Sequence, residues 1–197
     1  FVTGGIGGVH RHSEITMDVS ADLTELARTS VIVVSAGIKS ILDIPRTLEV
    51  LETNGVPAMA YQTDEFPAFF SPYSGVAAPA RVDSAEEVAE AYLAAQDLGL
   101  SHGMIVAVPN RDPVGANVED AIQAALVEAE QRAIRGQAVT PFVLKRVAGI
   151  TGGDSLRSNM ALVEQNAVVG AEIAIAISRR KNRPPSFVQT STFATPP

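Results

Sequence analysis

The residue best suited to covalent chemistry in this sequence is Lys39. It is one of three lysines, against twelve arginines, and it follows the apolar run Val31–Val34 and the small residues of 35–38. Ligands of parallel sheets bind at the carboxyl ends of strands, and burial among small apolar residues favours the neutral, nucleophilic form of an amine. The alternative is a lysine whose aliphatic stem lies over the start of a helix with its charge in water.

Two carboxylates and a hydroxyl stand close together at Asp18, Ser20 and Asp22. One interpretation is structural: Ser20 caps a helix, and Asp22 lies favourably in its first turn. The functional interpretation is that Asp18 lies outside the helix and binds a hard cation, while Ser20 and Asp22 contact substrate. A single carboxylate that leaves room for several waters suits Mg²⁺ or Mn²⁺ better than zinc.

A glycine-rich run extends from Gly4 to Gly8. Such a run lets backbone N–H groups converge on an anion, or it forms a tight structural turn. It does not match the dinucleotide-binding fingerprint, because His10 stands where the last glycine is required. His10 and His12 together give only a weak metal signal, and Asn159 is by itself an ordinary polar residue.

An α/β framework is needed to bring these residues together. Short apolar runs typical of buried parallel strands alternate with capped, amphipathic segments typical of helices. We expect strands at 31–34, 56–60 and 104–108, and a long loop over 62–82. Helices are expected after Ser20, from Pro45 to Gly55, from Ser84 to Leu98, from Asn117 to Ala133, from the cap and first residue Thr140-Pro141, and over 155–178. This alternation predicts an α/β fold with a mostly parallel central sheet.

Composition narrows the class of protein. Hydrophobic residues make up 46% of the 197 residues and charged residues 19%, which predicts a globular chain with a sizeable core. The net charge of −7 and the low aromatic content argue against binding a nucleic acid polymer. The absence of cysteine excludes a thiol nucleophile and a Cys-ligated metal. No apolar run reaches the roughly 18–20 residues of a membrane span, so we expect a soluble protein of the cytoplasm, with an organelle left open.

The chain divides into residues 1–181, which carry the α/β pattern, and a proline-rich tail or linker over 182–197. The sequence opens on Phe1-Val2 running into glycines, without an initiating Met. We interpret this opening as the end of a strand that begins upstream, and therefore expect the sequence to be part of a longer protein.

Several segments, in order and with their spacing, resemble the pseudouridine-5′-phosphate glycosidase family, also called indigoidine-synthase-A-like. The resemblance covers roughly residues 1–178, which makes it far more specific than any single motif. The segments that carry it are Val2–Arg11, Asp18–Leu23, Ala36–Asp43, Leu48–Pro57, Tyr61–Phe69 and Arg135–Phe142.

The resemblance implies a three-layer α/β/α fold, a homotrimer and a divalent metal, typically Mn²⁺. It implies reversible cleavage of the carbon–carbon glycosidic bond of pseudouridine 5′-phosphate, which gives uracil and ribose 5-phosphate. Lys39 matches the family's Schiff-base lysine, and Asp18 matches its metal-binding aspartate. The substrate-binding residues implied are Ser20, Ala21, Asp22, His10 and Asn159.

The sequence also departs from the family pattern. His12 stands where a glycine is usual, and the family's general-acid glutamate and a second substrate-binding lysine belong to a part that precedes the matched segments. We therefore expect these residues to carry the nucleophile and metal end of the site without the acid. Some members continue into a sugar-kinase domain, with which the proline-rich tail is compatible.

Three hypotheses follow. The first is a pseudouridine-5′-phosphate glycosidase, because an amine can form the iminium that lets a carbon leaving group depart, whereas a carboxylate cannot. The second is an inactive fragment that serves as a phosphate-binding or assembly module. The third is another Schiff-base lyase that acts on a sugar phosphate through the same lysine. Release of uracil from pseudouridine 5′-phosphate separates the first from the other two.

Overall fold

The computed structural model describes residues 1–115 and 118–182. Its centre is a four-stranded sheet in the order β2-β6-β4-β5, and all three strand pairs are parallel. The strands are β2 (Ile32–Ser35), β4 (Ala58–Tyr61), β5 (Ala80–Val82) and β6 (Met104–Ala107). The expected mostly parallel α/β sheet is confirmed.

Helices cover both faces of this sheet. The helices α4 (Ala85–Asp97) and α7 (Asp154–Lys181) pack on one face with alternate strand residues such as Val106, and they form one hydrophobic cluster. The helices α2 (Ala21–Leu26) and α3 (Ile44–Thr53) share the other cluster with residues such as Ile105. Because neighbouring strand residues point to opposite faces, the result is the three-layer α/β/α arrangement.

The first residues extend the sheet. Val2 forms a parallel bridge with Val34, and Thr3 N donates to Val34 O at 3.0 Å. Beyond the glycines, β1 (Val9–His10) pairs antiparallel with β3 (Leu42–Asp43), and the short helix α1 (Ser13–Thr16) follows. The first three residues therefore run beside β2, and the glycine-rich segment after them runs beside the turn that follows β2.

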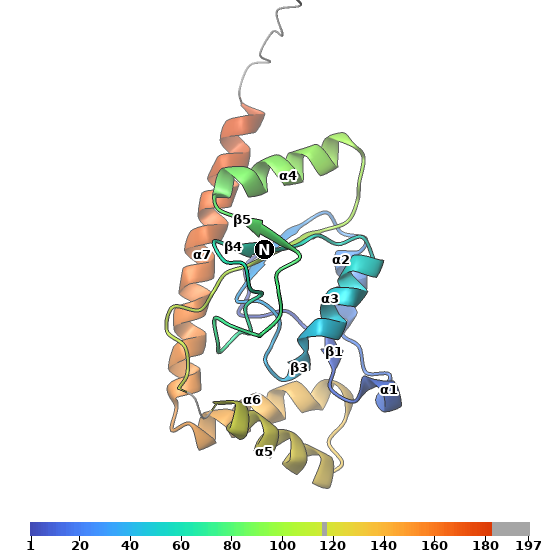
Figure 1. Cartoon of the computed structure of the whole chain (residues 1–197), viewed down its shortest axis with the longest axis vertical. Helices are drawn as coiled ribbons and strands as arrows, with labels where there is room; N and C mark the ends of the chain where they lie inside the picture. The colour runs from blue at the N-terminus through green and yellow to red at the C-terminus, as the bar shows by residue number, and fades with distance from the viewer. Residues whose placement is uncertain (116–117, 183–197) are drawn as a thin grey trace, which may run out of the picture.

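Two helices form a hairpin at the end of the molecule where α7 begins (Figure 1). They are α5 (Val118–Gln131) and α6 (Val139–Ile150), joined through the 3₁₀ turn η1 (Gly136–Ala138). The sequence had suggested Thr140 and Pro141 as the cap and the first residue of α6. Both residues instead lie inside the first turn of this helix. Pro141 is tolerated there because the first N–H groups of a helix lack intrahelical partners.

The loop expected over 62–82 ends in strand β5, whose first two residues are exposed, so it has no apolar run that would indicate a strand. The cap expected at Asn117 and the tail beyond residue 182 lie outside the described residues.

Helix α7 meets the length and composition of a membrane span, since an 18-residue window has a mean hydropathy of 1.5. The expectation from the sequence concerned apolar runs, and Glu164 and Glu172 interrupt the apolar residues of this helix. The structure packs this helix against the sheet, since Leu162, Val169 and Ile173 are buried in the two hydrophobic clusters. Helix α7 thus belongs, with α4, to one helical layer of the α/β fold. It runs along one side of the molecule (Figure 1).

Candidate active site

The glycine-rich segment is the meeting place of the site residues predicted from the sequence. A Cβ on Gly5 would lie 3.3 Å from Lys39 Cγ, and one on Gly4 would lie 3.0 Å from Asn159 Oδ1. A Cβ on Gly7 would overlap the Ser20 hydroxyl. These glycines therefore leave the space in which side chains from three separate elements approach the same backbone.

Lys39 stands in the turn directly after β2, as predicted, and is half-buried. Two backbone bonds hold this turn to the glycine segment: Ile6 N donates to Gly37 O at 3.1 Å, and Lys39 N donates to Ile6 O at 3.2 Å. Gly37 has a φ of +85°, and any Cβ there would collide with the carbonyl oxygen of Pro67. The turn therefore packs between the backbone of the glycine segment and the backbone of Pro67.

The loop that carries Phe69, to which the sequence analysis gave no role in the site, closes the site. Phe69 N donates to Ala36 O at 2.8 Å, and the Ser40 hydroxyl donates to Ala68 O at 2.6 Å. Phe69 has a φ of +61° and is 3% exposed. Its ring lies 2.6 Å from the position of a Cβ on Gly5, so it forms an apolar wall beside the Lys39 stem.

The segment Ser20–Asp22 makes the contacts of the structural interpretation. Ser20 caps α2, since its hydroxyl accepts from Asp22 N at 3.2 Å, which confirms the predicted cap. Gly7 N donates to Asp22 Oδ2 at 2.7 Å, so this carboxylate also fixes the glycine segment. Ala21 is the exposed first residue of the helix.

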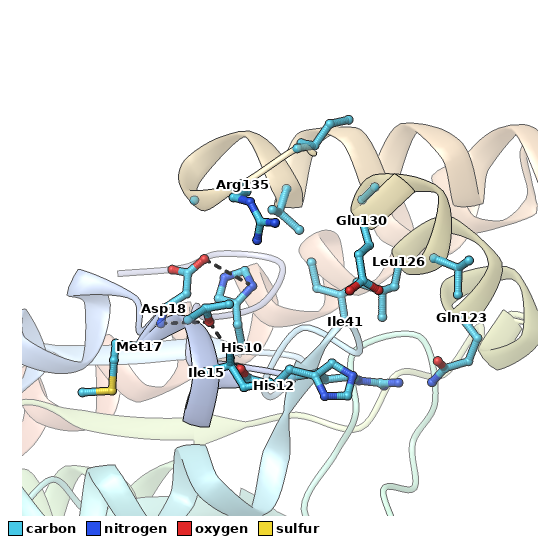
Figure 2. Close-up of a pocket in the computed structure, with 17 residues that line it drawn as sticks. His10, His12, Ile15, Met17, Asp18, Ile41, Gln123, Leu126, Glu130 and Arg135 are labelled. Carbon is cyan, nitrogen blue, oxygen red and sulfur yellow. Dashed lines mark hydrogen bonds and ion pairs between the residues drawn. The ribbon is translucent and has the colours of Figure 1, made fainter. Parts of the chain in front are cut away.

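Asp18 and His10 belong to a neighbouring groove. Asp18 Oδ2 lies 3.9 Å from His10 Nδ1, and His10 N donates to Asp18 O at 3.0 Å. Figure 2 shows both side chains on one wall, with Arg135 and Glu130 on the other. The groove measures about 630 Å³, and its lining includes neither Lys39 nor Asn159. The structure therefore gathers the site residues predicted from the sequence into two adjoining groups.

The donor set suits a weakly ligated hard cation. In residues 1–115 and 118–182, no group of three or more His, Cys, Asp or Glu could hold a metal. Asp18 supplies one carboxylate at an open groove, which fits Mg²⁺ or Mn²⁺ with several retained waters and does not fit a closed zinc site. His12, at the same groove, has a φ of +63°, which explains why a glycine would suit that position.

An ion pair ties this groove to the Lys39 turn. Arg11 Nη1 donates to Glu119 Oε1 at 2.9 Å, and Arg11 Nη2 donates to Ser40 O at 2.6 Å. Burial would raise the pKa of Glu119, but its hydrogen bonds with Arg11 and Gln123 outweigh that effect and hold the pKa below its usual value. Arg11 therefore links α5 to the residue after Lys39.

Fold and site together define a class: a parallel-sheet α/β protein with a half-buried lysine in the turn that follows a sheet strand. Residues 1–176 match the family described as indigoidine synthase A like protein. The chain belongs to this family, and the resemblance seen in the sequence is confirmed.

Relatives agree with this assignment. A pseudouridine-5′-phosphate glycosidase of Arabidopsis thaliana is 52% identical over 182 residues, which are 91% of this chain and 55% of the relative. One from Caldanaerobacter subterraneus is 50% identical over 182 residues, 91% of this chain and 59% of the relative. The chain thus spans less than two thirds of the length of these relatives.

The fold has a solved counterpart. The prealnumycin C-glycosynthase AlnA, crystallised with ribulose 5-phosphate, is 38% identical and superposes with a TM-score of 0.84. The match covers 92% of this chain and 61% of AlnA. At that identity, the counterpart supports the same three-layer fold for the two proteins.

Proposed function

We propose that this chain carries the nucleophile and metal end of a pseudouridine-5′-phosphate glycosidase, which reversibly converts pseudouridine 5′-phosphate to uracil and ribose 5-phosphate. The observation that carries the proposal is the position of Lys39, half-buried after β2 and facing Gly5 beside the Phe69 ring. The names of the relatives give the substrate, and the sugar phosphate bound to AlnA is of the same chemical class.

The chemistry requires an amine. The bond from uracil C5 to sugar C1′ offers no leaving oxygen to protonate, so a carboxylate pair is insufficient. The C1′–O4′ bond breaks and its electron pair goes to O4′, which takes up a proton, while Lys39 Nζ bonds to C1′ and loses one proton. When the C1′–C5 bond breaks, its electron pair takes up a proton at C5, and the nitrogen lone pair forms the C1′=N iminium. Water then adds to the iminium, which releases ribose 5-phosphate and restores the amine.

The other residues of the chain orient the sugar. Asn159 approaches Gly4, next to the glycine that Lys39 approaches, so its amide can bond to the hydroxyls of an opened ribose. Ser20, Ala21 and Asp22 lie at the start of α2, where the Ser20 hydroxyl and the positive end of the helix dipole favour an anionic or polyhydroxy ligand. His10 adds a polar group at the adjoining groove.

We propose that Asp18 holds one Mn²⁺ per subunit, mostly through waters. When bound, the cation neutralises negative charge of the phosphorylated substrate. Mn²⁺ titration followed by electron paramagnetic resonance should give weaker binding in Asp18→Asn. Asp120→Asn makes the same charge change at an exposed site on α5 and should bind as the unaltered chain does. Equal binding in both variants would remove Asp18 from the metal site.

Trapping with borohydride tests the nucleophile. Reduction in the presence of ribose 5-phosphate should add the sugar mass to the peptide that contains Lys39, because the iminium becomes a stable secondary amine. Lys39→Ala should abolish the adduct. Lys145→Ala removes an exposed lysine of α6 and should leave the adduct unchanged. An adduct that persists in Lys39→Ala would refute the assignment.

We further propose a soluble homotrimer in the cytoplasm. Support comes from the family resemblance and from large apolar side chains that stay exposed along α7, namely Leu156, Met160, Val163, Val168 and Ile175. Light scattering coupled to size exclusion should give three times the chain mass. A monomer at micromolar concentration would contradict the assembly.

A further inference from the structure

We propose that Asn110 is a positioning residue for Lys39 and Asn159, a role that rests on the function proposed above. Asn110 comes three residues after β6 and is 3% exposed. It touches neither Lys39 nor the groove in the described structure, and its action is indirect. Asn110 lies where the segment after β6 meets the loop that carries Phe69 and the helix α7.

Every polar atom of the Asn110 amide is engaged. Nδ2 donates to Phe69 O at 3.1 Å and to Ser158 Oγ at 2.8 Å. Oδ1 accepts from Asp112 N at 3.0 Å, and the Ser158 hydroxyl donates to Asp112 O at 2.6 Å. A buried network in which each member is satisfied is stiff, since every break leaves an unpaired polar group.

One branch of the network supports the wall beside the nucleophile. Phe69 is held in a left-handed backbone conformation, with φ +61°, which costs free energy in a residue with a Cβ. Its N–H donates to Ala36 O in the Lys39 turn, while its carbonyl accepts from Asn110. Asn110 therefore fixes the residue whose ring stands against Gly5 and the Lys39 stem.

The other branch supports the helix turn that carries Asn159. Ser158 is buried on α7 and directly precedes Asn159, whose Oδ1 approaches Gly4. The bond from Asn110 to Ser158 holds this turn of α7 against the carboxyl end of β6. The Asn110 side chain thus sets the distance between Lys39 and the Asn159 amide, which would bind the sugar.

The test measures borohydride trapping of ribose 5-phosphate against sugar concentration. Asn110→Ala should lower the maximal trapping rate by about 10- to 100-fold, as expected for a misplaced reacting group, with a smaller change in the half-saturating concentration. Asn110→Asp keeps the shape and can accept from Ser158, but it cannot donate to the Phe69 carbonyl. If the bond from Asn110 to the Phe69 carbonyl positions the lysine, Asn110→Asp should therefore trap sugar slowly, as Asn110→Ala does.

A matched control separates positioning from stability. Thr151 is the buried residue that ends α6, and its hydroxyl bonds to Val147 O and Ser155 Oγ without reaching the site. Thr151→Val should lower the melting temperature yet trap sugar at the normal rate. A folded Asn110→Ala that traps at the normal rate would overturn the proposal.

Amide hydrogen exchange gives a readout that does not depend on the proposed function. The amides of Phe69 and Lys39 are bonded across the site and should exchange faster in Asn110→Ala, but not in Thr151→Val. If the unaltered chain forms no adduct, the glycosidase assignment fails while this comparison still decides the positioning role. Unchanged protection of both amides in Asn110→Ala would refute it.

Discussion

At the scale of single residues, the glycines of the site are defined by the side chains beside them. Gly7 lacks a Cβ because the Ser20 hydroxyl and the Asp22 carboxylate occupy that space, and its N–H donates to the same carboxylate. Open space surrounds Gly149, in contrast, on the exposed face of α6. The same residue type therefore has a packing role in one place and none in the other.

This contrast gives a matched pair of substitutions. Gly7→Ala should cost about 1–3 kcal/mol of the free energy of unfolding, because the methyl group displaces Ser20 and Asp22. It should also weaken sugar trapping. Gly149→Ala should stabilise by about 0.5–1 kcal/mol, since alanine is the better helix former. Urea denaturation measures both, and a neutral Gly7→Ala would contradict the crowding described here.

The position of Lys39 was predictable, whereas its surroundings were not. A β-branched run followed by small residues indicates a strand and the turn at its end, and the lysine lies in that turn. Phe69 and Asn110 carry no local signal, because a positive φ at a phenylalanine and a buried amide bond depend on contacts far along the chain.

At the scale of elements, local capping was the most readable signal. Ser20 and Ser84 bond to backbone N–H groups two and three residues on, so the information lies within one turn of helix. The start of α6 was misjudged because Pro141 is equally acceptable at several first-turn positions. Strand β5 was missed because it pairs only with β4 at the sheet edge.

The contact between the loop after β1 and helix α5 should respond to acid. The pKa of Glu119 is held below its usual value, after burial is outweighed by Arg11 and Gln123, so the ionised form is favoured in the folded state. Its stabilisation is complete above pH 4.5 and is lost as the pH falls through the lower folded pKa. For a half-exposed pair we expect about 0.2–1 kcal/mol.

Melting temperatures across this acid range test the linkage. Glu119→Gln should be less stable than the unaltered chain at neutral pH, and the difference should shrink below pH 4.5. Asp120→Asn makes the same charge change one residue along α5 and should show no such convergence. Parallel pH profiles for the unaltered chain and Glu119→Gln would contradict the ion pair's role.

At the scale of the whole molecule, β6 joins the two hydrophobic clusters. Ile105 and Val106 are adjacent and 0% exposed, yet Ile105 packs with the cluster of α2 and α3, and Val106 with that of α4 and α7. The strand pairs with β2 on one side and with β4 on the other. Neither cluster can lose its packing without exposing this shared strand, so we expect one cooperative unit.

Truncation on each face of β6 tests that cooperativity. Ile105→Ala should cost about 2–5 kcal/mol and Val106→Ala about 2–3 kcal/mol, from lost burial and the cavity left behind. Val127→Ala, at a half-exposed site on α5, should stay within about 0.5 kcal/mol. Tyr61 and Tyr92 belong to the α4–α7 cluster, so once the exposed Tyr73 is replaced by Phe in every variant, tyrosine emission reports that face, whereas far-ultraviolet circular dichroism reports all helices. The two signals should give the same denaturation midpoint in every variant. Separate midpoints in Ile105→Ala would mean that the two faces unfold independently and that β6 does not couple them.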